Sequence, residues 1–324
     1  MKRDTVLVIG DEVQIALDAG SGRNAKGVIA LANEARFTAV NFSEPLTAYA
    51  IGWRDPTNLQ EQLDLMFPPV EVPRRFEYKS AKNSDEFLSE ADDVRAIGAA
   101  FKKVEYSGTS VNEKTLNKGL TVTLDRDEMV AGTEERTVAR LIARLNRNDF
   151  RRGVALLAAN ATNTNKTWNS SADPDQDVAD DLLTGGDARG VESNTLVYGP
   201  TAWSLRRKAY RAKTDTALVL DGSMTVDQVV QSLGLDKGLV SKARYQSTAA
   251  GKTRVVGSYV FMYYTDPVGS QEDPSNAKHF WTPTESGRFR VYREEHAKTL
   301  DISVEHYGTL ACPSSLGMRM FTVS

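Results

Sequence analysis

The chain has 324 residues, more than one hydrophobic core usually organises, so its length predicts two compact parts with extended segments. Apolar residues make up 40% and charged residues 26%, which excludes a disordered or collagen-like chain. A net charge of −3 is too weak for bulk attraction to nucleic acid, so any DNA contact must be local. Neither a membrane-spanning apolar run nor a signal peptide is evident, so we expect a cytosolic protein with no membrane contact.

Residues 1–66 alternate short apolar stretches with Gly, Asn, Pro and Asp. This pattern predicts an extended N-terminal arm with one short helix at about Leu59 to Leu65. An extended segment buries little surface by itself, so we expect a neighbouring subunit to order the arm. The stretch from Phe67 to Pro73 predicts a stiff connector, because each proline fixes its own φ and restricts the residue before it.

Residues 74–118 predict a long two-stranded excursion. Two strand-like runs, Arg75 to Lys79 and Ala100 to Tyr106, flank a charged stretch from Ser84 to Asp93. Such a ribbon is marginal in water when isolated, so it needs a partner surface. A solvated loop tip is the alternative interpretation of its acidic residues. The candidate subunit-interface residues are Asp85, Glu86, Glu90, Asp92, Asp93 and Arg95.

A strand from Leu120 to Leu124 precedes a long helix that we expect to begin at the capping-box-like pair Asp125 and Glu128 and to end near Asn160. One face of this helix is apolar and nearly the opposite face carries five arginines. The apolar face holds Val138, Leu141, Ile142 and Leu145, and the basic face holds Arg136, Arg140, Arg144, Arg147 and Arg151. The basic face is either solvated, or paired with a neighbouring subunit, or in contact with packaged DNA or an internal scaffold.

A mixed α/β unit is expected from about Trp168 onward, because helical and strand patterns alternate there. Pro174 opens the first helix and Gly185-Gly186 closes it. The expected helices are 175–183, one opening at Pro200, and 221–233; the expected strands are 194–199, 239–245, 255–264, 288–292, 300–304 and 318–323.

Motifs for metal or nucleotide chemistry fail on inspection. The series Asp173, Asp175 and Asp177 starts like a calcium loop but lacks its glycine and its final glutamate, so acidic residues at a helix N-terminus are the better interpretation. Gly251-Lys252-Thr253 lacks the leading glycine of a phosphate loop and predicts a turn. The stretch Val6 to Gly10 lacks the glycines of a dinucleotide-binding strand. We therefore expect no cofactor and no bound metal.

Catalytic residues are not indicated either. The three histidines, His279, His296 and His306, lack metal-ligand spacing, and no Gly-x-Ser-x-Gly elbow occurs. Cys312 is the single cysteine, so an internal disulfide is impossible and a hydrolase using this thiol is the remaining enzymatic alternative. We expect a protein that is not an enzyme.

Four stretches carry a resemblance to a known family: Phe76-Glu77-Tyr78-Lys79, Asp93-Val94-Arg95-Ala96-Ile97-Gly98, Asn194-Thr195-Leu196-Val197-Tyr198-Gly199 and Gly287-Arg288-Phe289-Arg290-Val291-Tyr292. With the order of arm, charged ribbon, long helix, inserted α/β unit and returning strands, the chain resembles the major capsid proteins of tailed phages, which have the HK97-like fold. The likeness runs from about Met66 to the end.

The resemblance implies an α+β fold with an N-terminal arm at 1–66, an E-loop region at 67–119, a peripheral domain at 120–167 and 285–324 with a long spine helix, and an axial domain at 168–284. It also implies self-assembly into hexamers and pentamers of an icosahedral shell around non-specifically packaged double-stranded DNA. Portal and decoration proteins are the further partners it implies. The short N-terminus favours a separate scaffolding protein. The expected location is the virion capsid, with the host cytoplasm during assembly.

Two related alternatives remain open. An encapsulin-type nanocompartment shell shares the fold and would hold cargo enzymes on its inner wall. A phage tail-like assembly protein is the third possibility.

Overall fold

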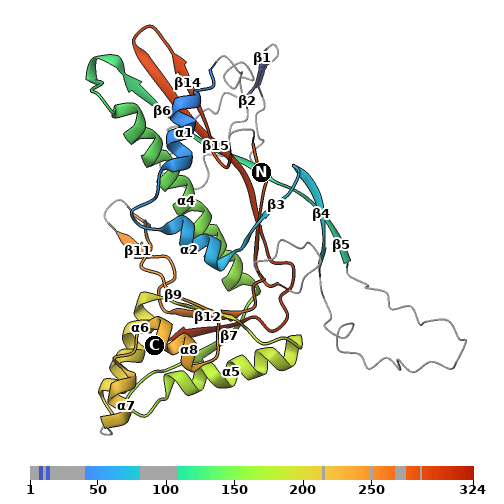
Figure 1. The fold of residues 1–324 in the computed structure, drawn as a ribbon, viewed down its shortest axis with the longest axis vertical. Coiled ribbons are helices and arrows are strands. Elements are labelled where there is room, and N and C mark those ends of the chain that lie inside the picture. The colour runs from blue at the N-terminus through green and yellow to red at the C-terminus, as the bar shows by residue number, and fades with distance from the viewer. Residues whose placement is uncertain are drawn as a thin grey trace, which may run out of the picture.

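The computed structural model describes residues 7–9, 12–14, 41–80, 109–213, 216–248, 251–266, 275–284 and 287–324. These residues form two five-stranded sheets with helices packed against both (Figure 1). The α+β fold class predicted from the sequence is therefore confirmed. Among the described residues, no helix combines the length and the apolar character that a bilayer crossing requires.

The first sheet is built around the long strand β15 (Thr299–Ala311). β15 pairs antiparallel with β6 (Leu116–Asp125) on one side and with β14 (Arg290–Glu295) and β13 (Lys278–Trp281) on the other. β3 (Pro69–Glu71) adds to β13 in the parallel direction. The two returning strands predicted at 288–292 and 300–304 thus pair with each other. The proline-rich connector supplies the edge strand β3, and an edge position tolerates proline, which has no backbone N–H to donate.

The second sheet has the strand order β7-β16-β12-β8-β9. Its strands are β7 (Thr162–Lys166), β16 (Arg319–Val323), β12 (Tyr259–Tyr263), β8 (Thr195–Tyr198) and β9 (Lys237–Val240). β7 and β16 come from 120–167 and 285–324, the ranges for which the resemblance implies a peripheral domain, so this sheet joins residues of both proposed domains. The domain boundaries stay a prediction.

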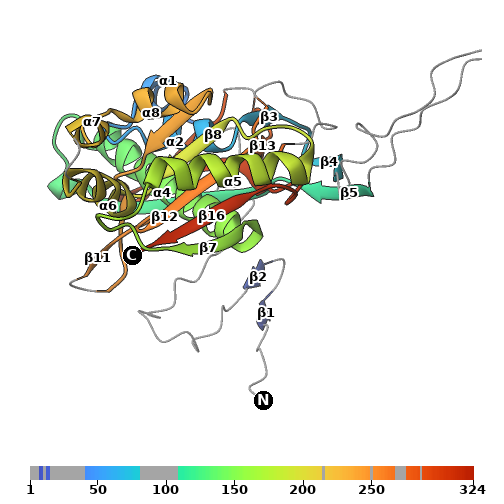
Figure 2. The same ribbon diagram turned by 90° about the horizontal axis from the view of Figure 1, so that it is seen from below.

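Helices cover both faces of the second sheet, which explains its continuous apolar strands. Val260 and Met262 of β12 face a cluster formed with α5 (Pro174–Arg189), α6 (Pro200–Arg211) and α8 (Val226–Ser232). The alternate residues Phe261 and Tyr263 face the opposite cluster, to which α2 (Leu59–Met66) and the C-terminal half of α4 (Thr133–Asn160) contribute. Figure 2 shows α5 lying across this sheet.

The spine helix α4 (Thr133–Asn160) connects the two sheets. Its 28 residues span about 42 Å at 1.5 Å per residue. The predicted apolar face is confirmed, because Val138, Leu141, Ile142 and Leu145 are all buried against the first sheet. Further along the helix, Phe150, Val154 and Leu157 are buried against the second sheet.

Two predicted helix boundaries are wrong. Asp125 caps only a 3₁₀ turn (Arg126–Glu128). α4 begins after Gly132, because the positive φ of 77° at Gly132 is not compatible with a continuous right-handed helix. α5 continues through Gly185-Gly186 to Arg189, and Gly190, with a positive φ of 81°, caps it. Gly185 lets the backbone of Gly317 approach the helix closely.

The helix predicted at 221–233 is two helices, α7 (Thr216–Asp221) and α8. The side chain of Thr225 forms a complete capping box with Gln228, which starts α8 anew. The strand predicted at 239–245 also divides, into β9 and β10 (Arg244–Gln246). β10 pairs with β11 (Lys252–Arg254) in a separate hairpin. The turn predicted at Gly251-Lys252-Thr253 is therefore wrong for Lys252 and Thr253, which lie in strand β11.

Residues 41–66 pack on their own chain, so the expectation that a neighbour orders this part of the arm is wrong. α1 (Glu44–Gly52), which was not predicted, buries Leu46 and Ala50 against α4 and the first sheet. The predicted short helix is confirmed as α2 (Leu59–Met66) and lies in the core beneath the second sheet. Most of residues 1–40 lie outside the described residues, apart from a small hairpin of β1 (Leu7–Ile9) and β2 (Glu12–Gln14).

Candidate subunit-contact surfaces

The predicted ribbon begins as a two-stranded hairpin that stands apart from both sheets (Figure 1). β4 (Arg75–Ser80) pairs antiparallel with β5 (Thr109–Lys114). The predicted strand at Arg75 to Lys79 is therefore confirmed. The predicted second strand at 100–106 lies outside the described residues, as do the interface candidates Asp85, Glu86, Glu90, Asp92, Asp93 and Arg95.

Aromatic residues anchor the base of this hairpin to the body. The ring of Phe280 in β13 lies 4.6 Å from the ring of Phe76 and 5.3 Å from that of Tyr78, measured between centroids. Val70 and Ala311 complete the same buried cluster. On β5, by contrast, side chains alternate between exposed and half-buried, so the hairpin leaves much of its surface open to solvent.

On the basic face of α4, some arginines contact other groups of the same chain and others make no such contact among the described residues. Arg136 turns back to the start of its own helix, where its guanidinium donates to the carbonyl oxygens of Gly132 and Ala131 at 2.9 and 2.8 Å. The guanidinium of Arg151 stacks over the ring of Tyr245, 4.0 Å from its centroid. Both interactions leave these arginines exposed but fix where they point.

Arg140 and Arg144 are exposed, and no described carboxylate forms an ion pair with either of them. Arg147 is half-buried and lines a groove of about 530 Å³ together with Lys242 and Arg244. The predicted contrast between an apolar and a basic face is thus present. What the basic face binds stays a prediction.

A buried cluster of charged groups joins α4 to the first sheet, and sequence patterns did not reveal it. The ammonium of Lys118 and the guanidinium of Arg152 each lie 2.8 Å from the same Asp149 oxygen, and the His306 ring lies 3.4 Å from the other. Burial acts to raise the pKa of Asp149, but the surrounding cationic groups outweigh it and lower that pKa. Burial lowers the pKa of His306 to about 3.

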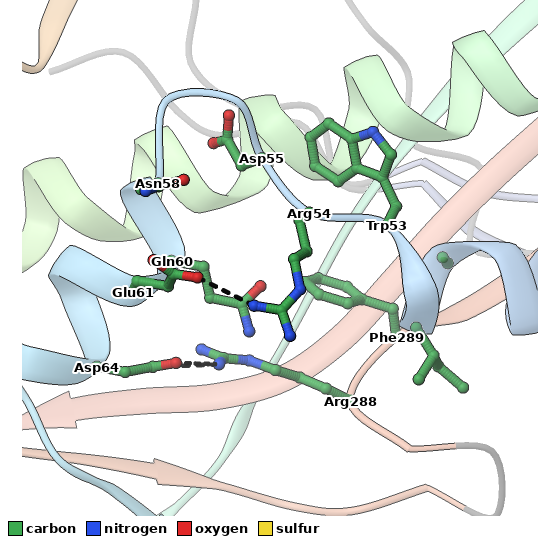
Figure 3. Close-up of a pocket in the computed structure, with 11 residues that line it drawn as sticks. Trp53, Arg54, Asp55, Asn58, Gln60, Glu61, Asp64, Arg288 and Phe289 are labelled. Carbon is green, nitrogen blue, oxygen red and sulfur yellow. Dashed lines mark hydrogen bonds and ion pairs between the residues drawn. The ribbon is translucent and has the colours of Figure 1, made fainter.

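A cleft of about 350 Å³ lies between α1, the turn that leads into α2, and the start of β14 (Figure 3). Arg288 reaches across it to Asp64 at 3.2 Å, and Arg54 pairs with Glu61 at 3.3 Å. Asp55 is also engaged, because its carboxylate accepts bonds from the amide and hydroxyl of Thr57. These polar groups hold the cleft's own walls together, so we assign it a structural role.

The acidic series at the start of α5 likewise binds groups of its own chain. Asp173 caps the helix, accepting a bond from Gln176, and Asp175 forms a two-point ion pair with the fully buried Arg206 at 2.6 Å. Asp177 pairs with Lys166 at 2.7 Å. This arrangement supports the helix-terminus interpretation over a calcium loop.

Cys312 lacks the environment of an activated nucleophile. Its thiol donates to the carbonyl oxygen of Ser314 at 3.2 Å. Burial raises its pKa to about 12, so the thiol stays protonated at neutral pH. This finding weighs against a hydrolase that uses Cys312.

Comparison with known proteins shows the fold. No model of a known protein family matches the sequence, and no curated protein matches it either. The chain is similar to the crystal structure of a phage-related protein from Bordetella bronchiseptica RB50, with a TM-score of 0.64 and 19% identity over 86% of this chain and 96% of that one. A structure from Gordonia phage Cozz matches with a TM-score of 0.49 and 10% identity, covering 84% of this chain and 89% of that one.

At these identities the comparison establishes the fold alone. The HK97-like α+β fold inferred from the resemblance is therefore confirmed.

Proposed function

We propose that this chain is the major capsid protein of a tailed double-stranded DNA phage, and that its copies form the hexamers and pentamers of an icosahedral shell. The observation that carries this proposal is the β4–β5 hairpin. It is anchored by Phe76 and Tyr78 yet joins neither sheet of its own chain. Similarity of fold to a phage-related protein supports the same conclusion.

A firmly anchored but uncovered hairpin is suited to lie on a second copy of the chain. Two-stranded ribbons are marginal in water, so an additional surface stabilises them. Obligate interfaces bury on the order of 2,000 to 5,000 Å², and projecting elements supply such area without enlarging the core. The interface candidates Asp85, Glu86, Glu90, Asp92, Asp93 and Arg95 belong to this proposal, through pairing with a basic patch on the neighbour.

The basic face of α4 is proposed to meet negative charge in the assembled particle. Arg140 and Arg144 are exposed, and among the described residues neither makes the carbonyl or ring contacts that engage Arg136 and Arg151. Guanidinium groups bind phosphate or carboxylate oxygens in two-point geometry, so packaged DNA, a scaffold or a neighbouring subunit could supply the partner. A DNA contact of this kind would be independent of base sequence.

The remaining assignments follow from the proposed function. A separate scaffolding protein, a portal and decoration proteins are the proposed partners. The proposed location is the virion capsid, with assembly in the host cytoplasm. We propose no catalytic role, which agrees with the protonated thiol of Cys312.

Sedimentation of the purified full-length chain, followed by negative-stain electron microscopy, tests the proposal. We expect rings or closed shells built from many copies. A chain that stays monomeric at high concentration would refute it. Particles isolated from producing cells should contain double-stranded DNA, whereas protein cargo without DNA would identify a nanocompartment shell instead.

A further inference from the structure

The turn that joins β14 to β15 places three metal-ligating side chains together. They are Glu294, His296 and Asp301, and one potential ligand atom from each lies within 4.8 Å of the others. The Nε2 atom of His296 lies 3.6 Å from a carboxylate oxygen of Asp301 and 3.9 Å from one of Glu294. The hairpin reaches one end of the molecule in Figure 1.

Strand register explains why these residues meet. Glu294 and Asp301 are directly opposite partners in the antiparallel ladder, so their side chains share one face. His296 follows Glu294 by two residues and therefore points to that same face. Glu295, between them, points the other way and pairs with Arg126 and Arg293.

The backbone of the turn is held in place on both sides. The amide of His296 donates to the carbonyl oxygen of Thr299 at 2.9 Å, and the amide of Arg126 donates to that of Lys298 at 3.0 Å. Asp301 is only 6% exposed, so packing restricts its side chain. Little reorganisation is needed to bring the three ligand atoms around one ion.

The ligand set and spacing fit a small transition-metal ion. Zn²⁺ binds imidazole nitrogen and carboxylate oxygen at about 2.0 to 2.2 Å in tetrahedral geometry, which places neighbouring ligand atoms about 3.4 Å apart. The His296 separations from Asp301 and Glu294 are only slightly longer than this. Two carboxylates would balance the charge of a divalent ion, and water would complete its coordination.

We propose that Glu294, His296 and Asp301 form a binding site for a divalent transition-metal ion of the zinc type, which fastens the β14–β15 turn. The site does not depend on the proposed function, because its residues all belong to one chain. Sequence spacing alone does not indicate the site, because the antiparallel pairing of β14 with β15 brings Asp301 beside Glu294.

Calorimetric titration of the purified full-length chain with Zn²⁺ tests the site. We expect one ion per chain and micromolar affinity. Replacing a ligand, in His296→Ala or Glu294→Gln, should weaken binding by about tenfold or more, because even outer-shell partners of metal sites contribute about 10 to 100-fold. His279 and His306, the other two histidines, are buried, so histidine binding elsewhere is limited.

Glu295→Gln is the matched control, because it removes a carboxylate from the same hairpin on the opposite face. It should leave Zn²⁺ affinity within about twofold of the wild type. Co²⁺ should give visible d–d absorption in the wild type and the control but not in His296→Ala. Absence of Zn²⁺ binding in the wild type, or equal weakening in Glu295→Gln and His296→Ala, would overturn the proposal.

Discussion

The ammonium of Lys118 lies 2.8 Å from a carboxylate oxygen of Asp149, which fastens β6 to the middle of the spine helix α4. The Asp149 side chain is 2% exposed and that of Lys118 is 10% exposed. A charge pair removed from water in this way depends on both partners. Removing one of them leaves the other charge buried without its counter-charge.

Replacing Asp149 by Ala should therefore reduce the free energy of unfolding by about 3 to 5 kcal/mol. Denaturant unfolding of the unassembled chain measures this loss. The double variant Lys118→Met with Asp149→Leu should lose less than the sum of the single changes, because no uncompensated charge remains. Lys114→Met, an exposed change on the neighbouring strand, serves as the control. If the losses of unfolding free energy in the two single variants add up to the loss in the double variant, Lys118 and Asp149 are not energetically coupled.

Acid should destabilise the fold through its buried histidines. Burial lowers the pKa of His306 to about 3 and that of His279 well below its usual value near 6.5. At a pH between the folded and the unfolded pKa values, His306 and His279 are protonated in the unfolded chain but neutral in the folded chain. The stabilisation is thus complete above pH 6.5 and declines as the pH falls towards the folded pKa values, by up to about 1.4 kcal/mol per pH unit for each histidine.

Denaturant unfolding at several pH values from 7 to 4.5 measures that slope. His306→Gln should make the dependence on pH shallower, because it removes one of the two buried histidines. The groups that face His306 are Asp149, Lys118, Arg152 and Arg288. A wild-type stability that is flat between pH 6.5 and 4.5 would contradict the assignment.

Much of the framework could be predicted from the sequence because it depends on local periodicity. The faces of α4 follow the 3.6-residue spacing of Val138, Leu141 and Arg140, and the continuous apolar strand at 195–198 follows from burial on both sides. Pro200 and Pro174 likewise open the helices that were expected there.

The features that sequence patterns did not predict depend on contacts between distant segments. Lys118, Asp149 and His306 are far apart in the chain, and nothing in their local sequences relates them. The inward packing of α1 depends on the hydrophobic surface that α4 and β14 present to Leu46. The pair Gly185-Gly186 predicted a helix end, yet the helix continues and Gly185 lies against the backbone of Gly317.

Phe280→Ala should release the base of the β4–β5 hairpin. Phe280 is fully buried between Phe76 and Tyr78, and truncating a buried phenylalanine costs about 3 to 5 kcal/mol. Because the hairpin base loses the ring on which Phe76 and Tyr78 pack, we expect faster proteolysis within 74–118 and fewer closed particles. Limited proteolysis and particle counting measure both effects. Cleavage at the wild-type rate together with normal assembly would contradict the anchoring role.

Charge reversal on the spine helix, in Arg140→Glu with Arg144→Glu, should impair assembly or DNA retention and leave the fold intact. Both side chains are exposed, so their change in unfolding free energy should stay within about 0.5 kcal/mol each. The same charge change at Lys208 and Arg211, exposed on α6, is the matched control. Gradient sedimentation and the DNA content of particles provide the readout. Stable, DNA-filled particles from the α4 variant would exclude a role for this basic face.

Cryo-electron microscopy of assembled particles tests the central claim most directly, because it locates the β4–β5 hairpin relative to neighbouring copies. We predict a closed icosahedral shell in which the hairpin of each subunit lies across the body of an adjacent one. A reconstruction in which the hairpin contacts only its own subunit, or a preparation that yields no ordered shells, would contradict the account.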